Sequence, residues 1–213
     1  MLHSFDLACP FRDSQLAAHL EVLRILRREG SVRAALAVPH QAYAGSQLRM
    51  ARSWQLDQRG SRLCSPEDVE DILTAALPRI EPLERLSICD RTLPIEIADR
   101  LWELHCAING VTDNKAKLVA CSKILHHALP DLIVPIDRTY TGRFLGFSEQ
   151  QFQPAAPQRR IFYEAFAGFR QIALTPRFSS QVTGNDWRTS VGKLVDNLVC
   201  AFVLLEDGNH AHS

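Results

Sequence analysis

The chain repeats apolar residues at helical spacing along most of its length, and no stretch alternates apolar and polar residues long enough to predict a strand. Residues 14–30 place leucines on one stripe and end at Gly30, a residue that commonly stops helices. Residues 65–77 open with Ser65 and Pro66 and then acids, the expected order for a helix N-terminus. Further helices are predicted over 94–108, from Asp113 to about Leu129, from Asp137 onward, and over 157–174 and 190–206. The sequence therefore predicts an all-α fold of about seven to nine helices.

The length of the chain suits one compact helical unit over 1–213, with room for two lobes that share a core. We expect a helical lobe over about 65–145, which contains a hairpin at 94–129 and Asp137. The second lobe would combine 1–64 with 146–213. Two segments without helical period, 38–64 and 175–189, are expected to be irregular.

Charge and composition limit the possible partners. Lys plus Arg and Asp plus Glu number 24 each, so the strongly basic footprint of many nucleic-acid binders is absent from the whole-chain sum. Any nucleic-acid contact would use a local basic face. The N-terminal stretch does not read as a signal peptide, no apolar run is long enough to span a bilayer, and the six cysteines form no Cys-x-x-Cys pair. These features predict a cytoplasmic protein with reduced thiols and no membrane contact.

Residues 108–144 carry the most specific local pattern, in which a helix end, a turn, a helix, an extended apolar link and a new helix follow one another. Gly110 in the turn INGVTDN is free to adopt a positive φ, and amides at the start of the following helix would suit a phosphate. The link LIVPI ends at Asp137, directly before a helix. Asp137 is either a plain helix cap or the carboxylate of an active site.

This arrangement resembles the helix–hairpin–helix DNA glycosylase superfamily, which has the fold of 8-oxoguanine glycosylase. In that superfamily the hairpin reads Leu-Pro-Gly-Val-Gly, Lys-x-Ala follows, and the link ends in a Val-Pro-Val-Asp type of sequence. Ile108, Gly110 and Val111 match the hairpin, whereas Thr112 replaces its second glycine and the turn is one residue longer. Val134-Pro135-Ile136-Asp137 matches the link, and CSKILHHALPDLIVPID is similar to a signature of small bacterial members. The match covers roughly 40 of the 213 residues.

The resemblance implies a two-lobed helical bundle that flips a nucleotide out of duplex DNA into a pocket between its lobes. The family aspartate stabilises the cationic sugar or activates the nucleophile as the base leaves, and here that residue would be Asp137. Members that also cut the backbone use a lysine that forms a Schiff base. Lys117 lies nearest to that position, and Lys123 belongs to the Ser-Lys pair of the small bacterial members. Single-function members need no such lysine.

Several residues are candidates for contacts with the nucleic acid. Arg49 and Arg52, with Arg59 and Arg62, form either an arm along the DNA or a solvated loop. Adjacent histidines on a helix point about 100° apart, so we expect one of His126 and His127 in the core and the other beside the base. The expected DNA contacts are Gly110, Val111, Thr112, Asn114, Lys115, Arg138, Arg143, Arg49 and Arg52, and the expected base pocket is His126, His127 and Tyr140.

Two functions remain open at this point. The first is a DNA glycosylase-like enzyme, a monomer or weak dimer, that removes a damaged or modified base from double-stranded DNA in repair or in defence against foreign DNA. It would need no cofactor, and no third ligand at a helpful spacing supports a metal site. The second is a non-catalytic module on the same scaffold that binds nucleic acid or protein. An enzyme requires Asp137 in the wall of a cleft, whereas a binding module would bury it as a cap.

Overall fold

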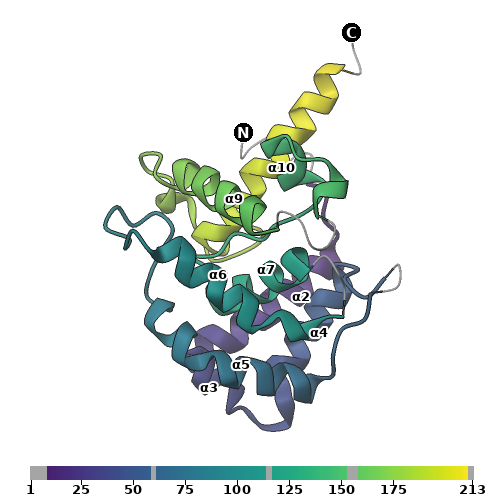
Figure 1. Ribbon diagram of the computed structural model, residues 1–213, viewed down its shortest axis with the longest axis vertical. Coiled ribbons are helices and arrows are strands. Elements are labelled where there is room, and N and C mark those ends of the chain that lie inside the picture. Colours follow the sequence, from purple (N-terminus) through teal and green to yellow (C-terminus); the bar gives the residue numbers. More distant parts are fainter. Residues whose placement is uncertain (1–8, 59–60, 114–116, 153–157, 211–213) are drawn as a thin grey trace.

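The computed structural model describes residues 9–58, 61–113, 117–152 and 158–210. In these ranges the chain is helical, with short 3-10 turns and an isolated bridge between Leu63 and Thr112 (Figure 1). The described α-helices are α2 (Asp13–Glu29), α3 (Val32–Leu36), α4 (Ala42–Ser53), α5 (Pro66–Ile80), α6 (Ile97–Ala107), α7 (Lys117–Ala128), α8 (Tyr140–Leu145), α9 (Gln158–Ala173) and α10 (Val191–His210). The predicted all-α class is confirmed for this part of the chain.

Local signals in the sequence set the ends of two helices as predicted. Helix α2 ends at Gly30, whose φ of 80° is the left-handed conformation that costs glycine little. At the start of α5, the Ser65 side chain accepts the N–H of Asp68, and the Asp68 side chain accepts the N–H of Ser65. This reciprocal capping box satisfies two backbone donors that a helix start leaves without partners.

The expectation that 38–64 is irregular is wrong, because α4 lies in its middle. The buried face of α4 includes Tyr43 and Met50 but also Ser46 and Gln47, so it shows no clean apolar stripe. Gln47 is tolerated there because its amide donates to Tyr43 Oη at 3.1 Å and to the Ile124 carbonyl at 3.4 Å. Tertiary hydrogen bonds thus replace apolar packing on part of this helix.

The helices form two adjoining groups around one continuous apolar core (Figure 1). Helices α2 to α7 pack against one another, and α2 contacts both α4 and α7. Helices α8, α9 and α10 form the other group, with α9 also contacting α6. The N-terminal helices therefore belong with α5 to α7, which differs from the expected lobe of 1–64 plus 146–213.

Helix α10 begins in the core and ends at the surface. Leu194, Val195 and Val199 are buried, whereas Phe202 and Leu205 near the C-terminal end are partly exposed. Figure 1 shows this end projecting beyond the other helices. Within the described ranges, no helix combines the length and the apolar character that crossing a membrane requires.

The apolar link after α7 is buried from Leu132 to Ile136 and has no regular secondary structure from Ile133 onward. The Ser122 hydroxyl of α7 accepts the N–H of Ile136 at 3.0 Å. On the other side, the N–H of Gly192 donates to the Pro130 carbonyl at 3.2 Å. A β-carbon on Gly192 would lie 2.5 Å from the carbonyl oxygens of Pro130 and Ile133, so only glycine fits at this crossing.

The hairpin between α6 and α7 departs from the expected open turn. Asn109–Val111 form a 3-10 turn, and Gly110 does not adopt a positive φ. A β-carbon on Gly110 would lie 3.2 Å from Ile72, so close packing is what this glycine provides. Val111 and Thr112 are buried, and the Thr112 hydroxyl donates to the Arg62 carbonyl at 3.0 Å. Neither side chain is available to grip a DNA backbone, which corrects the expectation for these two residues.

Candidate functional site

The carboxylate of Asp137 has two different environments. Its Oδ1 accepts the backbone N–H groups of Thr139 at 2.8 Å and Tyr140 at 3.1 Å in the turn that leads into α8. Thr139, and not Asp137, is the N-cap residue of that helix. Its Oδ2 lies 3.8 Å from Lys123 Nζ, and 31% of the Asp137 side chain is exposed. One oxygen therefore fixes the orientation of the carboxylate, while the other faces the Lys123 ammonium.

Asp137 stands in the wall of a pocket of about 400 Å³. One side is the segment that follows α4, another is the first half of α7, and the third is the start of the segment that leads into α8. The wall residues are Trp54, Gln55, Leu56, Gln58, Ser61, Val119, Ala120, Lys123, Asp137, Arg138, Thr139 and Glu149. Pockets that hold small ligands have volumes of roughly 300–1,000 Å³, so this one suits a nucleotide-sized group.

Lys123 is the lysine that faces Asp137. Its side chain is only 7% exposed, and its Nζ lies 4.5 Å from the centroid of the Trp54 ring. Burial lowers the pKa of Lys123, while the carboxylates of Asp137 and Asp196 oppose that change. Lys193, a second buried cation, lowers this pKa further. Lys123 is thus a desolvated amine at the inner wall of the pocket.

Lys117, the other candidate lysine, has a different role in the structure. Its Nζ donates to the Asn109 carbonyl at 2.9 Å, across the base of the hairpin. Lys117 is not part of the pocket wall. The two lysines lie six positions apart on α7, which places them on different faces of the helix. The geometry brings Lys123, and not Lys117, to Asp137.

His126 and His127 are both buried, and neither belongs to the wall of the pocket beside Asp137. His126 Nδ1 lies 2.7 Å from the Ile133 carbonyl, and His127 Nδ1 lies 2.8 Å from the Lys123 carbonyl. Burial lowers the pKa of both rings, that of His127 to about 4. The expectation that one of them lines the base pocket does not hold for this pocket. Its wall takes Val119, Ala120 and Lys123 from α7, whereas the last turn of the helix lies in the core.

Tyr140 also lies outside the pocket wall. Its backbone N–H binds Asp137, and its ring packs edge-on against Phe11 with 6.4 Å between centroids. Burial raises the pKa of its hydroxyl. Tyr140 therefore holds the Asp137 carboxylate through its backbone N–H, and its ring is not part of the pocket wall.

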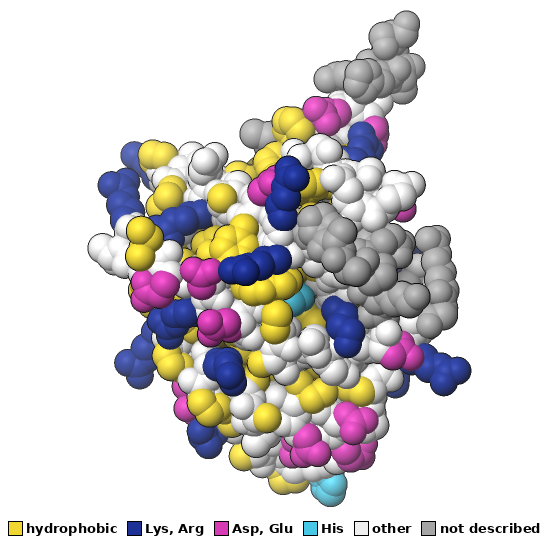
Figure 2. Space-filling model, in the orientation of Figure 1, with side chains coloured by type: hydrophobic (Ala, Val, Ile, Leu, Met, Phe, Trp, Pro, Cys, Tyr) yellow, Lys and Arg dark blue, Asp and Glu magenta, His cyan; other side chains and the backbone are white. Residues whose placement is uncertain are grey.

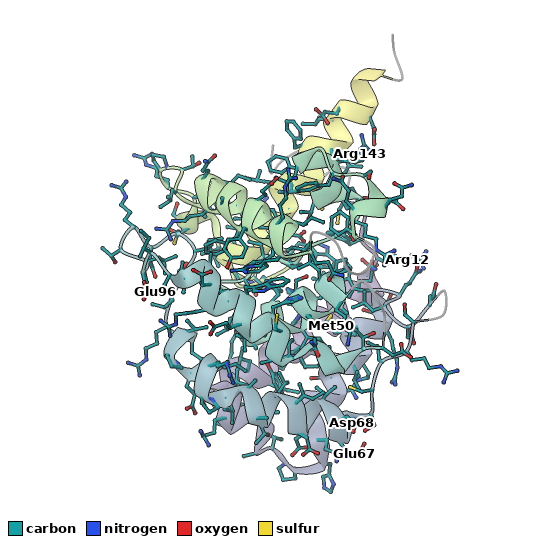
Figure 3. All side chains as sticks on the ribbon, in the orientation of Figure 1. Arg12, Met50, Glu67, Asp68, Glu96 and Arg143 are labelled. Atoms are coloured by element: carbon teal, nitrogen blue, oxygen red, sulfur yellow. The ribbon has the colours of Figure 1, made fainter. Side chains whose placement is uncertain are left out.

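Most of the arginines predicted to hold phosphates are paired with acids. Arg49 lies 2.6 Å from Glu21, Arg52 lies 3.9 Å from Asp57, and Arg143 forms a two-point pair with Asp207 on α10 (Figure 3). Arg138 lies in the pocket wall. On the face shown in Figure 2, basic and acidic side chains are interspersed. Asn114 and Lys115 lie outside the described residues.

Trp54, Gln55, Gln58 and Glu149 line the pocket although no motif pointed to them. Trp54 is the central contact, since its ring packs against Phe11 with 4.7 Å between centroids and lies close to both Lys123 and Lys193. Lys193 is bound to Asp196 and lies 4.3 Å from the centroid of Phe11. No sequence motif could reveal this cluster, because its members Phe11, Trp54, Lys123 and Lys193 come from four separated segments of the chain.

The residues that the structure describes contain no group of three or more His, Cys, Asp or Glu side chains arranged to hold a metal ion. Comparison of the chain with protein families, with curated proteins and with solved structures finds no match. The function is therefore argued from the geometry of the site and from the sequence pattern around Asp137.

Proposed function

We propose that this chain is a DNA glycosylase-like enzyme that cleaves the N-glycosidic bond of a damaged or modified base flipped out of duplex DNA. The observation that carries the proposal is the setting of Asp137, whose Oδ1 is held by two backbone N–H groups while its partly exposed side chain lines a pocket of about 400 Å³. A residue that only holds a turn requires no adjoining cavity. An active site requires both the fixed orientation and the space.

The chemistry follows from the charge that develops as the bond breaks. When the base leaves, the sugar carries positive charge on C1′ and its ring oxygen, and a fixed carboxylate oxygen nearby stabilises that charge. Water then adds at C1′, and the proton that it loses is balanced by one that the departing base anion takes up from solvent, which leaves an abasic site and the free base. Oδ2 of Asp137 is suited to the first task because the two N–H bonds to Oδ1 hold the carboxylate in place.

Lys123 sets whether a second reaction follows. An amine whose pKa is lowered by burial is neutral more often than an exposed lysine, and a neutral amine attacks the sugar carbon in place of water. Lys123 is 3.8 Å from Asp137, within reach of the same substrate atom. Strand cleavage would therefore depend on Lys123 and not on Lys117.

The test is abasic-site formation on duplexes that carry a panel of damaged and modified bases. We expect breaks that need alkali with the wild-type chain and none with Asp137→Asn, which keeps an accepting oxygen but loses the charge. Breaks without alkali that disappear in Lys123→Met would add the lyase step. Duplex binding without any base release across the panel would contradict the proposed function.

The binding module remains a second candidate because one observation favours it. Arg49, Arg52 and Arg143 are paired with acids, and Val111 and Thr112 of the hairpin are buried. Phosphate contacts make affinity fall steeply with salt. A module that binds nucleic acid would therefore hold the duplexes of the same assay more weakly as salt rises, whereas a module that binds protein would not hold them.

A further inference from the structure

Gln55, in the wall of the pocket beside Asp137, has a backbone conformation that is unfavourable for a glutamine. Its φ is 60°, in the left-handed region that glycine enters easily and that residues with a β-carbon enter at a cost. Gln55 lies just past the end of α4, and its N–H donates to the Arg52 carbonyl at 2.8 Å. The N–H of Leu56 donates to the Ala51 carbonyl at 3.1 Å. These two bonds form a Schellman motif, whose left-handed position is usually a glycine.

Two other helices of this chain end in the usual way. Helix α2 ends at Gly30 with a φ of 80°, and α8 ends at Gly146 with a φ of 73°. Gln55 is exposed, and its side-chain amide has no hydrogen-bond or ion-pair partner among the described residues. The glutamine therefore strains the end of α4, and its side chain forms no bond in the fold that would offset the strain. Residues that combine strain with no structural use are found at binding and catalytic sites.

The position of Gln55 separates it from the other strained residues. Five described residues other than glycine have a left-handed φ, and they are His40, Gln41, Gln55, Arg177 and Asp186. Of these, Gln55 alone belongs to the described wall of the pocket beside Asp137. Gln41 is its nearest counterpart, with a φ of 52° at the start of α4, but its side chain hydrogen-bonds to Glu67. The Gln41 side chain thus has a structural use, whereas the Gln55 side chain faces a pocket.

Charge is unevenly distributed over the described part of the pocket wall. Its charged members are Lys123, Asp137, Arg138 and Glu149. The described residues that the segment after α4 contributes are all uncharged, namely Trp54, Gln55, Leu56, Gln58 and Ser61. The charged side suits an anionic sugar-phosphate group, and the uncharged side, with its amides and aromatic ring, suits a neutral heteroaromatic base.

A glutamine amide is complementary to one edge of a base. It presents two N–H donors and a carbonyl acceptor next to each other. It can therefore form two hydrogen bonds to a base that has a donor beside an acceptor, as glutamine does with adenine in DNA. Bases that enzymes extrude from a duplex are recognised by hydrogen bonds to their Watson–Crick edge. The two backbone bonds of the Schellman motif fix the backbone of Gln55, so little order is lost when its amide binds.

We propose that Gln55 determines the specificity of this pocket, because its amide forms two hydrogen bonds with the Watson–Crick edge of the bound base. The identity of the bound group as a base rests on the proposed function. A class of substrate follows from the contact. The base must keep a donor beside an acceptor on this edge, so its damage or modification lies elsewhere on the ring. A methyl group on a Watson–Crick nitrogen removes one of the two bonds and excludes the base.

The first test measures the strain by thermal unfolding. We expect Gln55→Gly to raise the midpoint by about 2–4 °C, because glycine adopts the left-handed conformation easily. Gln55→Ala keeps the β-carbon and should leave the midpoint nearly unchanged. A lower midpoint for Gln55→Gly would show that the fold uses the side chain, which would overturn the proposal.

The second test measures binding of the four common 2′-deoxynucleosides by NMR, on protein labelled with ¹⁵N in its glutamine side chains. Gln55→Gly assigns the Gln55 signal. We expect at least one nucleoside to shift that signal, and to bind Gln55→Gly and Gln55→Ala about ten- to hundredfold more weakly than the wild type. The same nucleoside methylated on its Watson–Crick nitrogen should bind the wild type as weakly. Gln41→Gly is the matched control, since it relieves a left-handed glutamine outside the pocket wall and should bind as the wild type does.

A variant that gains stability and loses binding cannot be explained by a structural role of Gln55. Equal binding by the wild type and Gln55→Gly would overturn the proposal. So would equal binding of the nucleoside and its methylated form, or no binding of any nucleoside.

Base release is scored separately in the abasic-site assay. Nucleoside binding through Gln55 without base release would sink the proposed function and leave this inference standing. Base release that Gln55→Gly performs as well as the wild type, for every base of the panel, would do the reverse.

Discussion

The hydroxyl of Ser122 accepts the backbone N–H of Ile136 at 3.0 Å, and through this bond two pairs of consecutive residues meet. Lys123 follows Ser122 on α7, and Asp137 follows Ile136 at the end of the apolar link. A single hydrogen bond therefore sets the register between the helix that supplies the amine and the link that supplies the carboxylate. The same hydroxyl donates to the Val119 carbonyl at 3.0 Å, so its own position is fixed by α7.

Replacement of Ser122 by alanine should loosen this register. The buried N–H of Ile136 would lose its acceptor, which costs about 1–3 kcal/mol of unfolding free energy. We expect urea unfolding to show that loss of unfolding free energy. Because Asp137 would be less well positioned, we also expect any Asp137-dependent activity of the folded variant to fall. Ser180→Ala is the control, because the Ser180 hydroxyl bonds only within an exposed turn. Equal stability losses in the two variants would show that the bond to Ile136 contributes little.

The Lys123–Asp137 pair should respond asymmetrically to substitution. Lys123→Met removes a buried ammonium and leaves a carboxylate that is 31% exposed and bound by two N–H groups, so we expect a change close to neutral. Asp137→Ala removes both the acceptor of these N–H groups and the partner of a buried charge, so we expect it to destabilise by about 2–4 kcal/mol. Chemical unfolding of the two single variants measures this difference.

The double variant provides the control for that comparison. Once Lys123 is methionine, Asp137→Ala should cost only the lost bonds to the backbone N–H groups, about 1 kcal/mol. A cost that stays the same with and without Lys123 would mean that the two side chains are not coupled in solution.

Local signals in the sequence were sufficient for part of the fold. Gly30, Ser65 and Asp137 each act on neighbouring backbone groups. The structure confirms Gly30 and Ser65 as a helix end and a helix cap, whereas Asp137 holds the turn two residues before the N-cap of α8. Such bonds span a few residues, so their partners can be read from the sequence alone. The same reasoning could not place Gly110, whose conformation is set by Ile72 of a different helix.

Buried polar residues account for what sequence periodicity missed. Lys193, Asp196 and Asn197 resemble the solvated face of an amphipathic α10, yet all three are buried. Lys193 and Asp196 satisfy each other, and the Asn197 amide donates to the Trp187 carbonyl at 2.7 Å. Because these partnerships are tertiary, a pattern of apolar and polar residues cannot reveal them. The wall of the candidate site around Trp54 was hidden for the same reason.

Gly192 should be intolerant of any side chain. An alanine β-carbon there would meet two backbone oxygens at 2.5 Å, and backbone cannot move aside as a flexible side chain can. We expect Gly192→Ala to destabilise by several kcal/mol, about the cost of overpacking a rigid interior or more. Gly168→Ala on α9 is the matched control, since its nearest neighbour is a leucine side chain at 3.5 Å. In a helix that change should be neutral or stabilise by up to about 1 kcal/mol. Thermal unfolding measures the stability of both variants. Equal stability changes would show that Gly192 does not lie as close to the link as the structure places it.

Acid should destabilise the chain in part through His105. Burial between Trp102 and Phe162 lowers the pKa of His105 to about 4, below the value near 6.5 of an unfolded chain. Between these two values the unfolded chain binds more protons, so this contribution to stability is complete above pH 6.5 and falls as pH drops towards 4. His105→Phe should remove roughly 3 kcal/mol of that dependence while leaving stability at pH 7 unchanged or higher, because both ring nitrogens lack partners. Urea unfolding at pH 7 and pH 4.5 measures this, and a variant as acid-sensitive as the wild type would refute the assignment.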